Sequence, residues 1–404
     1  MTASVRPLDA PLAVRGRGLT KEFQDRTVLD AVDLDVAAGQ FVVLLGPSGS
    51  GKTTLLRCVA GTERPTSGTL WVGGAEVSGP AGHVPPERRG LAMVFQDYAL
   101  WPHMSARGNV AFAVRRLGLG RAEARVRTME MLERVGLAPL ADHYPGQMSG
   151  GEQQRVALAR ALGCGARLLL CDEPLSNLDA HLRERIRVEI STLCRDSGTS
   201  VVYITHDQQE AFALADKLGV MHQGRVLQWG TPESVHLRPN DAFVARFTGL
   251  AGQIRGQVVR VESPTRVEVR CGRYRLQATA PHPLAETATV DVLLRPDAIS
   301  MVAPSPSPQV LAALVKDVSF RAGWYEHVVD LPSGERLTGI RAGERHERGR
   351  NVGLQLDPAG CLAFAPPPAD DSSQLDALAG GNSSWLIGEN PIYLDISRSE
   401  VQLR

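Results

Sequence analysis

The 404-residue sequence contains no long hydrophobic segment. Its longest apolar runs, near Phe41 and Leu168, are only as long as a β-strand. A membrane-spanning helix needs about 20 apolar residues. The N-terminal stretch also lacks the apolar core of a secretory signal. We therefore expect a cytoplasmic chain, so that any work at a membrane requires another chain to provide the span.

The sequence has no excess of charge of either sign. Lys and Arg together number 44, as do Asp and Glu, so the formal net charge is zero. A broad basic surface for nucleic acid is therefore not indicated.

Cysteine is scarce and scattered, with no C-x-x-C pair that would indicate a metal site or a redox motif. Cys58 and Cys171 lie in apolar stretches and are typical of small core residues. We expect reduced structural cysteines rather than disulfides, and the same holds for the remaining four: Cys164, Cys194, Cys271 and Cys361.

One glycine-rich stretch indicates a nucleotide site. It reads GPSGSGKTT, follows the apolar run 41–45 and precedes a helical pattern. Glycines let backbone N–H groups crowd around phosphate oxygens, and a helix N-terminus adds positive potential. All fixed positions of a P-loop are filled, which disfavours the alternative of a ligand-free turn. The predicted ATP-binding residues are Gly46, Pro47, Ser48, Gly49, Ser50, Gly51, Lys52 for the β- and γ-phosphates, Thr53 for Mg²⁺, and Thr54.

Two further apolar strands end in groups that can act on a phosphate. The run RLLLCDEP ends in Asp172, which we expect to hold Mg²⁺ through its water shell, and Glu173, which can polarise the attacking water. The run TSVVYIT ends at His206, which can donate to the γ-phosphate, although a lone histidine is more often structural.

Three other positions have both a functional and a structural interpretation. Gln96 follows the predicted strand 89–95 and either faces Mg²⁺ or its water or simply caps the strand. Ser149 opens a helix as part of MSGGE, as a second phosphate cradle or an ordinary N-cap. Phe23 can stack on adenine or belong to the core.

An aromatic cluster lies in the turn that follows Gln96. Tyr98, Leu100 and Trp101 there either form a docking surface or fold back onto the following helices.

Taken in order, these motifs resemble the ATPase subunit of ABC transporters over roughly 14–249. The resemblance implies catalytic roles for Glu173, His206 and Gln96, and metal contacts for Thr53, Gln96 and Asp172. It makes Phe23 the adenine-stacking aromatic and Val28 its apolar neighbour. The remaining motif residues are the signature, Met148, Ser149, Gly150, Gly151 and Glu152, and the D-loop from Ser176 to Asp179. Glu152 departs from the glutamine that many members carry.

The resemblance also implies an assembly. Two ATPase subunits would pair head to tail, with each ATP and its Mg²⁺ between one P-loop and the other subunit's signature. Further implied partners are two membrane permeases and an extracytoplasmic solute-binding protein, with no nucleic acid, at the cytoplasmic face of the inner membrane. Ferric-iron or polyamine uptake is weakly favoured over sugar uptake.

The predicted fold class is an α/β P-loop NTPase core with an antiparallel β subdomain and a helical subdomain, followed by an all-β OB-like domain. The ATPase domain spans 14–249, with helices at about 97–160, after an N-terminal arm at 1–13. Short alternating strands predict the β domain at 250–368. Its strand around Asp297 resembles the regulatory domains of importers, whose motif has glutamate at that position. Residues 369–404 are typical of a flexible linker and tail.

The alternatives are of another class. A soluble ABC ATPase acting on nucleic acid or ribosomes would carry a long coiled-coil insertion or a second core, and this chain has neither. A P-loop kinase leaves Ser149 and His206 without a role. The β domain has too few aromatics, Tyr274, Trp324 and Tyr325 among them, to indicate a nucleic-acid barrel.

Overall fold

The computed structural model describes residues 12–176 and 178–366, and the chain divides after Val244 into two compact units. Strand β1 already begins at Leu12, inside the predicted arm. The rest of the arm, the linker and the tail predicted for 369–404 lie outside the described residues. Among the described residues, no helix has both the length and the apolar character that a membrane span requires.

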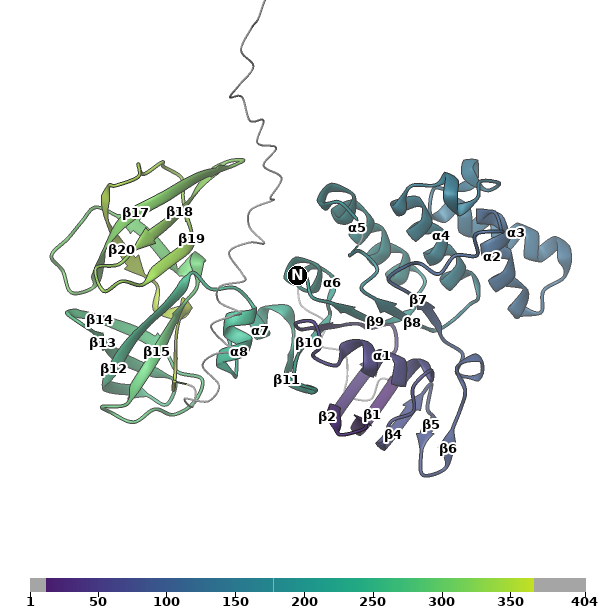
Figure 1. Cartoon of the computed structure of the whole chain (residues 1–404), viewed down its shortest axis with the longest axis horizontal. Helices are drawn as coiled ribbons and strands as arrows, with labels where there is room; N and C mark the ends of the chain where they lie inside the picture. Colours follow the sequence, from purple (N-terminus) through teal and green to yellow (C-terminus); the bar gives the residue numbers. More distant parts are fainter. Residues whose placement is uncertain (1–11, 177, 367–404) are drawn as a thin grey trace, which may run out of the picture. The chain divides into compact units, whose positions relative to one another are not determined.

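A six-stranded sheet in the order β11-β10-β3-β9-β8-β7 forms the centre of the first unit (Figure 1). All neighbours are parallel except the edge strand β11. Every residue of β3 and β9 is buried, as expected for continuous apolar runs in a sheet covered on both faces. The strands are β3 (Phe41–Leu45), β7 (Ala92–Val94), β8 (Leu168–Asp172), β9 (Ser200–Thr205), β10 (Lys217–His222) and β11 (Arg225–Gly230).

An antiparallel sheet in the order β2-β1-β4-β5-β6 forms the predicted β subdomain. Its buried residues join those of helix α1 (Lys52–Ala60) and of the central strands in one apolar cluster. This packing fixes the P-loop helix between two sheets. The strands are β1 (Leu12–Phe23), β2 (Arg26–Ala37), β4 (Ser67–Val72), β5 (Ala75–Gly79) and β6 (Gly82–His83).

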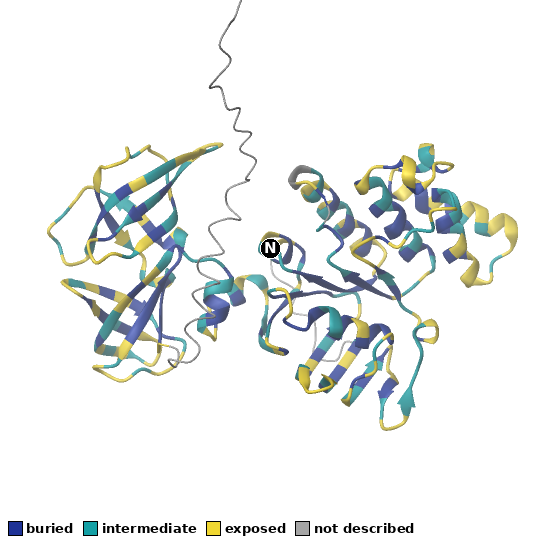
Figure 2. Cartoon of the chain, viewed as in Figure 1, coloured by how far each residue is buried: buried dark blue, intermediate teal, exposed yellow. Residues whose placement is uncertain are grey.

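The predicted helical subdomain is built from α2 (Ala106–Val114), α3 (Arg121–Arg134) and α4 (Gly150–Gly163). These helices share an apolar core that includes Met131 and Leu132, whereas most of α3 is exposed (Figure 2). The other helices of the first unit are α5 (Ala180–Asp196), α6 (Gln208–Leu214) and α7 (Pro232–Leu237).

The second unit contains two sheets where the sequence predicts one barrel-like module. Strands β12-β13-β14-β21-β15 close into a barrel, and β16-β20-β17-β18-β19 form a separate five-stranded sheet. Alternating strands look alike in either arrangement, because only the pairing partners differ. Helix α8 (Ala242–Phe247) lies at the division between the units. The strands are β12 (Gly252–Ser263), β13 (Arg266–Cys271), β14 (Tyr274–Thr279), β15 (Thr289–Leu294), β16 (Ile299–Val302), β17 (Val310–Arg321), β18 (Trp324–Asp330), β19 (Arg336–Ala342), β20 (Asn351–Leu356) and β21 (Cys361–Phe364).

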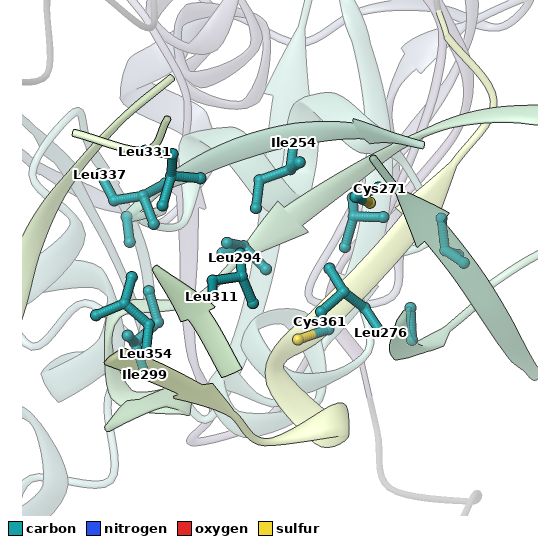
Figure 3. Packing of buried hydrophobic residues seen from close by; sticks show 14 of the residues in the cluster. Ile254, Cys271, Leu276, Leu294, Ile299, Leu311, Leu331, Leu337, Leu354 and Cys361 are labelled. Carbon is teal, nitrogen blue, oxygen red and sulfur yellow. The ribbon is translucent and has the colours of Figure 1, made fainter. Parts of the chain in front are cut away.

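The barrel and the second sheet share one apolar core. Figure 3 shows Leu294 of the barrel and Leu311 of the sheet between the two sets of side chains. Cys271 and Cys361 are buried in this core as free thiols, and burial raises the pKa of each to about 12. The six cysteines are all free, as predicted.

Candidate nucleotide and catalytic site

The P-loop follows β3 and wraps the start of α1. A Cβ on Gly46 would lie 2.2 Å from the backbone oxygen of Met221, so only glycine fits there. Gly51 caps α1 with φ 102°, which is a left-handed conformation that glycine adopts freely. Ser48 and Gly49 are exposed at the apex, and Ser50 is buried beneath them. The loop therefore presents its backbone outward at a helix N-terminus, which is the geometry of an anion site.

Lys52 is buried under this loop. Its Nζ donates to the backbone oxygens of Gly46 at 2.8 Å and Pro47 at 2.9 Å. Burial lowers the pKa of Lys52, while Glu173 and Asp172 nearby act in the opposite direction. Its Nζ also lies 3.5 Å from Ser50 Oγ, and such a cation, held by neutral oxygens, is well placed to gain from an incoming phosphate.

The predicted metal ligands Thr53 and Asp172 lie together. The Thr53 hydroxyl donates to Asp172 Oδ1 at 3.2 Å. Burial raises the pKa of Asp172, and the Thr53 hydrogen bond opposes that shift. A hydroxyl and a carboxylate are the hard oxygen donors that suit Mg²⁺, which otherwise keeps its waters and takes phosphate oxygens. No cluster of three His, Cys, Asp or Glu side chains with metal-binding geometry occurs within 12–176 or 178–366.

Glu173 and His206 form a direct pair. Leu45 of β3 pairs with Thr205 of β9, and Asp172 of β8 pairs with Ile204, so the residues after these strands emerge at one edge of the sheet. There His206 Nδ1 lies 2.9 Å from Glu173 Oε2. The hydrogen bond lowers the pKa of Glu173 and raises that of His206. Both shifts favour the charged forms of the pair, a carboxylate on Glu173 and an imidazolium on His206.

The backbone at Glu173 is strained. Its φ of 43° is a left-handed conformation that glutamate seldom adopts, and its N–H donates to Ile204 O at 3.1 Å. Such strain gathers at functional sites because the surrounding structure holds it in place.

The signature lies at the N-terminus of α4. Ser149 caps this helix, and Glu152 completes a capping box by accepting from Ser149 N at 2.8 Å and from Ser149 Oγ at 2.9 Å. These bonds lower the pKa of Glu152. Ser149 and Gly150 are exposed, while Met148 and Gly151 are buried. An exposed helix N-terminus with a serine is a second anion-binding geometry, on a different subdomain from the P-loop.

The D-loop connects Glu173 to α5. The Ser176 hydroxyl donates to the backbone oxygen of Glu173 at 2.9 Å, and Asp179 caps α5 by accepting from Leu182 N at 2.9 Å. Residue 177, which belongs to the predicted D-loop, lies outside the described residues.

The other predicted residues occupy separate places around this edge. Phe23 ends β1 and is 43% exposed, with Lys21 Nζ over its ring at 4.5 Å, so it is a surface aromatic rather than a core one. The backbone oxygen of Val28 lies 2.7 Å from where a Cβ on Gly51 would be, which places Val28 beside the P-loop. Gln96 is exposed, two residues beyond the end of β7.

The aromatic segment 98–101 folds back for the most part. Tyr98 is buried and Leu100 packs on the helical core, whereas the Trp101 ring lies 4.5 Å from that of exposed Phe112. Arg160 of α4 holds this segment by donating to Tyr98 O at 2.8 Å and to Ala99 O, with its guanidinium over Trp101. Sequence reasoning missed Arg160, because an arginine on a helix gives no signal of its partner.

Comparison with known proteins identifies the family. Residues 29–176 match the family described as ABC transporter. A spermidine/putrescine import ATP-binding protein of Rubrobacter xylanophilus is 38% identical over 358 residues, covering 87% of this chain and 93% of that protein. This chain belongs to the ABC transporter ATP-binding subunits.

Two other members extend this result. An Fe(3+) ions import ATP-binding protein of Escherichia coli O157:H7 is 39% identical over 350 residues, covering 86% of this chain and 97% of that protein. The structure of cbiO1 from Clostridium perfringens, part of the ABC transporter complex cbiONQ, is 27% identical with a TM-score of 0.52, covering 56% of this chain and 90% of that one. The predicted resemblance, fold class and activity, an ATPase coupled to transport, are confirmed.

Proposed function

We propose that this chain is the ATP-binding subunit of an importer for polyamines or ferric iron. The observation that carries the proposal is the single sheet edge where Lys52, the Thr53–Asp172 pair and the Glu173–His206 pair converge, in a chain similar over most of its length to import subunits. The similar proteins divide between the two solutes at nearly equal identity, so the choice between them belongs to experiment.

In the proposed mechanism the P-loop amides and Lys52 hold the triphosphate. Thr53, Asp172 and Gln96 would hold Mg²⁺, which would neutralise phosphate charge there. Glu173, whose pKa is lowered by its hydrogen bond to His206, polarises the attacking water. His206 donates to the γ-phosphate, and Phe23 and Val28 contact the adenine.

The exposed signature supports a head-to-tail dimer. Ser149, Gly150 and Gly151 cap the nucleotide of a second copy, which gives both anion-binding helix N-termini a ligand. Closure of the dimer on ATP is transmitted to two permeases through the surface from Gln96 to Trp101. Phe112, whose ring contacts Trp101, is also exposed. A solute-binding protein delivers the cargo, nucleic acid has no part, and the complex lies at the cytoplasmic face of the inner membrane.

The test is Glu173→Gln, with Glu184→Gln as control because Glu184 is an exposed glutamate of α5 paired with Arg187. We expect Glu173→Gln to bind ATP, to run as a dimer with ATP on size exclusion, and to release phosphate about 10²- to 10⁴-fold more slowly. The control keeps wild-type turnover. Normal turnover in Glu173→Gln would refute the catalytic assignment.

The transport role has its own experiment. The chain is expressed with the permease pair encoded beside it, and ATP turnover in proteoliposomes is measured with binding protein loaded with spermidine or with Fe³⁺. Stimulation by one of them names the solute. Co-purification with nucleic acid or ribosomes in place of permeases would favour the soluble ABC ATPase instead.

A further inference from the structure

The Glu173–His206 pair joins two loops that the sheet alone does not align. Glu173 begins the loop from β8 to α5, and His206 begins the loop from β9 to α6. A hydrogen bond of 2.9 Å between them depends on how both loops are held beyond the strand ends.

Arg183, on the first turn of α5, contacts both loops. Its Nη2 donates to the backbone oxygen of Leu178 at 3.0 Å. Its Nη1 lies 3.4 Å from Asp207 Oδ2, and its Nε lies 3.9 Å from Glu210 Oε1. The planar guanidinium spreads its donors over three nitrogens and so faces three separate acceptors, whereas the three donors of a lysine lie on one atom.

Each acid turns one oxygen to Arg183 and uses the other within its own segment of the chain, Asp207 for backbone N–H groups and Glu210 for side-chain hydroxyls. Asp207 Oδ1 caps α6 by accepting from Gln209 N at 2.7 Å and Glu210 N at 3.1 Å, while Oδ2 faces Arg183. Glu210 Oε2 accepts from Tyr203 and Thr205 of β9 at 2.9 Å each, while Oε1 faces Arg183. Arg183 is thereby tied to the residue next to His206 and to the strand that carries it.

On the other side Arg183 holds the D-loop. Leu178, whose carbonyl it binds, is buried, and its side chain lies 3.4 Å from where a Cβ on Gly150 of the signature would be. Ser176 of the same loop binds the Glu173 carbonyl. The contacts form a ring from Glu173 through the D-loop, Arg183 and Asp207 to His206, which closes on Glu173.

We propose that Arg183 is a positioning residue that sets Glu173 against His206 by fixing the D-loop to the start of α6. The proposal rests on the catalytic roles given to Glu173 and His206 above. Arg183 and Asp207 are each about 30% exposed at distances beyond an ideal hydrogen bond, so this ion pair alone adds little to global stability. Its main effect is therefore on geometry, where a displacement of about 1 Å can slow a reaction about 100-fold.

The test compares Arg183→Met and Arg183→Lys with Arg185→Met. Arg185 lies on the same helix, is 68% exposed and pairs only with Glu189 among the ion pairs of the described residues. We expect Arg183→Met to lower kcat for ATP about 10- to 100-fold, with KM within about twofold and the melting temperature little changed. Arg183→Lys restores part of kcat, because it keeps the charge beside Asp207, and Arg185→Met matches wild type.

A double-mutant cycle with Asp207→Asn isolates the link. Asparagine keeps the Oδ1 cap of α6 and removes the charge that faces Arg183. We expect Asp207→Asn and the Arg183→Met/Asp207→Asn double variant to lose no more kcat than Arg183→Met alone.

Unchanged kcat in Arg183→Met, an equal loss in Arg185→Met, or additive losses in the cycle would each overturn the proposal. If wild type hydrolyses ATP and Glu173→Gln does not, any of these results would refute the positioning role of Arg183 and leave the catalytic role of Glu173 intact. A normal rate in Glu173→Gln would instead refute the catalytic assignment on which the role of Arg183 rests.

Discussion

His206 in the first unit and His327 in the second occupy opposite electrostatic settings. His206 shares a hydrogen bond with the Glu173 carboxylate, which raises its pKa. His327, in the middle of β18, is fully buried, and its Nε2 accepts the backbone N–H of His346 at 3.1 Å. Burial lowers the pKa of His327, because removal from water disfavours the charged imidazolium.

The difference reflects what each imidazole contacts. In the first unit the Glu173–His206 pair lies just beyond the ends of β8 and β9, where a ligand and charge chemistry can use it, while buried Arg89 of that unit binds backbone oxygens. In the second unit His327 and Arg295 bind backbone atoms and hold the fold together. The same side chain is thus a candidate for chemistry in one unit and a structural acceptor in the other.

The largest expected effect tests this contrast directly. His206→Gln should lower ATP turnover about 100-fold, because it replaces the imidazole proposed to donate to the reacting phosphate with an amide that cannot be protonated. His327→Gln should leave turnover unchanged. Phosphate release at saturating ATP measures both, and a similar loss in the two variants would erase the distinction.

The next effect concerns the buried cation of the second unit. Arg295 is 3% exposed and donates to Ala245 O at 3.0 Å, to Thr248 Oγ1 at 2.8 Å and to Gly249 O. Burial lowers its pKa to about 10. Arg295→Met should destabilise the second unit by roughly 2–4 kcal/mol, because carbonyls that now accept charged hydrogen bonds lose their donor.

Urea unfolding with and without ATP assigns this loss to a unit, since ATP stabilises only the unit that binds it. Arg336→Met is the matched control, because Arg336 is 62% exposed and pairs with Asp330 at the surface. If both variants unfolded at the same urea concentration, the hydrogen bonds of Arg295 would not be what stabilises the second unit.

The contribution of His327 to the stability of the second unit is expected to depend on pH. This effect should be smaller than that of Arg295→Met and opposite in sign to the effect of a carboxylate-paired histidine. The pKa of His327 is lower in the folded state than its ordinary value near 6.5, so the unfolded chain binds the proton first. The stability that His327 contributes is therefore present above pH 6.5 and is lost as the pH falls from 6.5 to the lower pKa of the folded state. The loss is about 1.4 kcal/mol for each tenfold difference in proton affinity between the folded and unfolded states. His327→Gln should flatten the fall in unfolding free energy of the second unit between pH 7 and 5. An unchanged slope would contradict the assignment.

The smallest effect is on the stability of the first unit. Ser149→Ala removes the cap of α4 and should lower the unfolding free energy by about 1 kcal/mol. Its ATP-dependent dimerisation should fall much more, as sedimentation can measure. Asp179→Ala, which removes the cap of α5, should cost about as much stability.

Much of the site was predictable because several of its motifs follow a continuous apolar run, and such a run indicates a buried parallel strand. The P-loop, Asp172 and His206 were located this way. The contact between Glu173 and His206 was not, since it depends on β9 lying between β3 and β8, an order that no local pattern encodes. Register along β8 and β9 then decides which residues meet.

Other features depended on tertiary partners. Arg160 reaches the carbonyl of buried Tyr98 across 62 positions of sequence, and the link from Arg183 to Asp207 spans 24. The second sheet of the second unit was missed because alternating strands indicate a half-buried surface and not which strand pairs with which.

The contacts of Arg160 with residues 98–101 connect α4 rigidly to the aromatic segment. Arg160 stands 11 residues beyond Ser149, so about 16 Å of rigid helix separates the aromatic segment from the signature. Under the proposed function, a permease that shifts Trp101 would tilt the far end of this helix, and a nucleotide bound at Ser149 would move Trp101 in return.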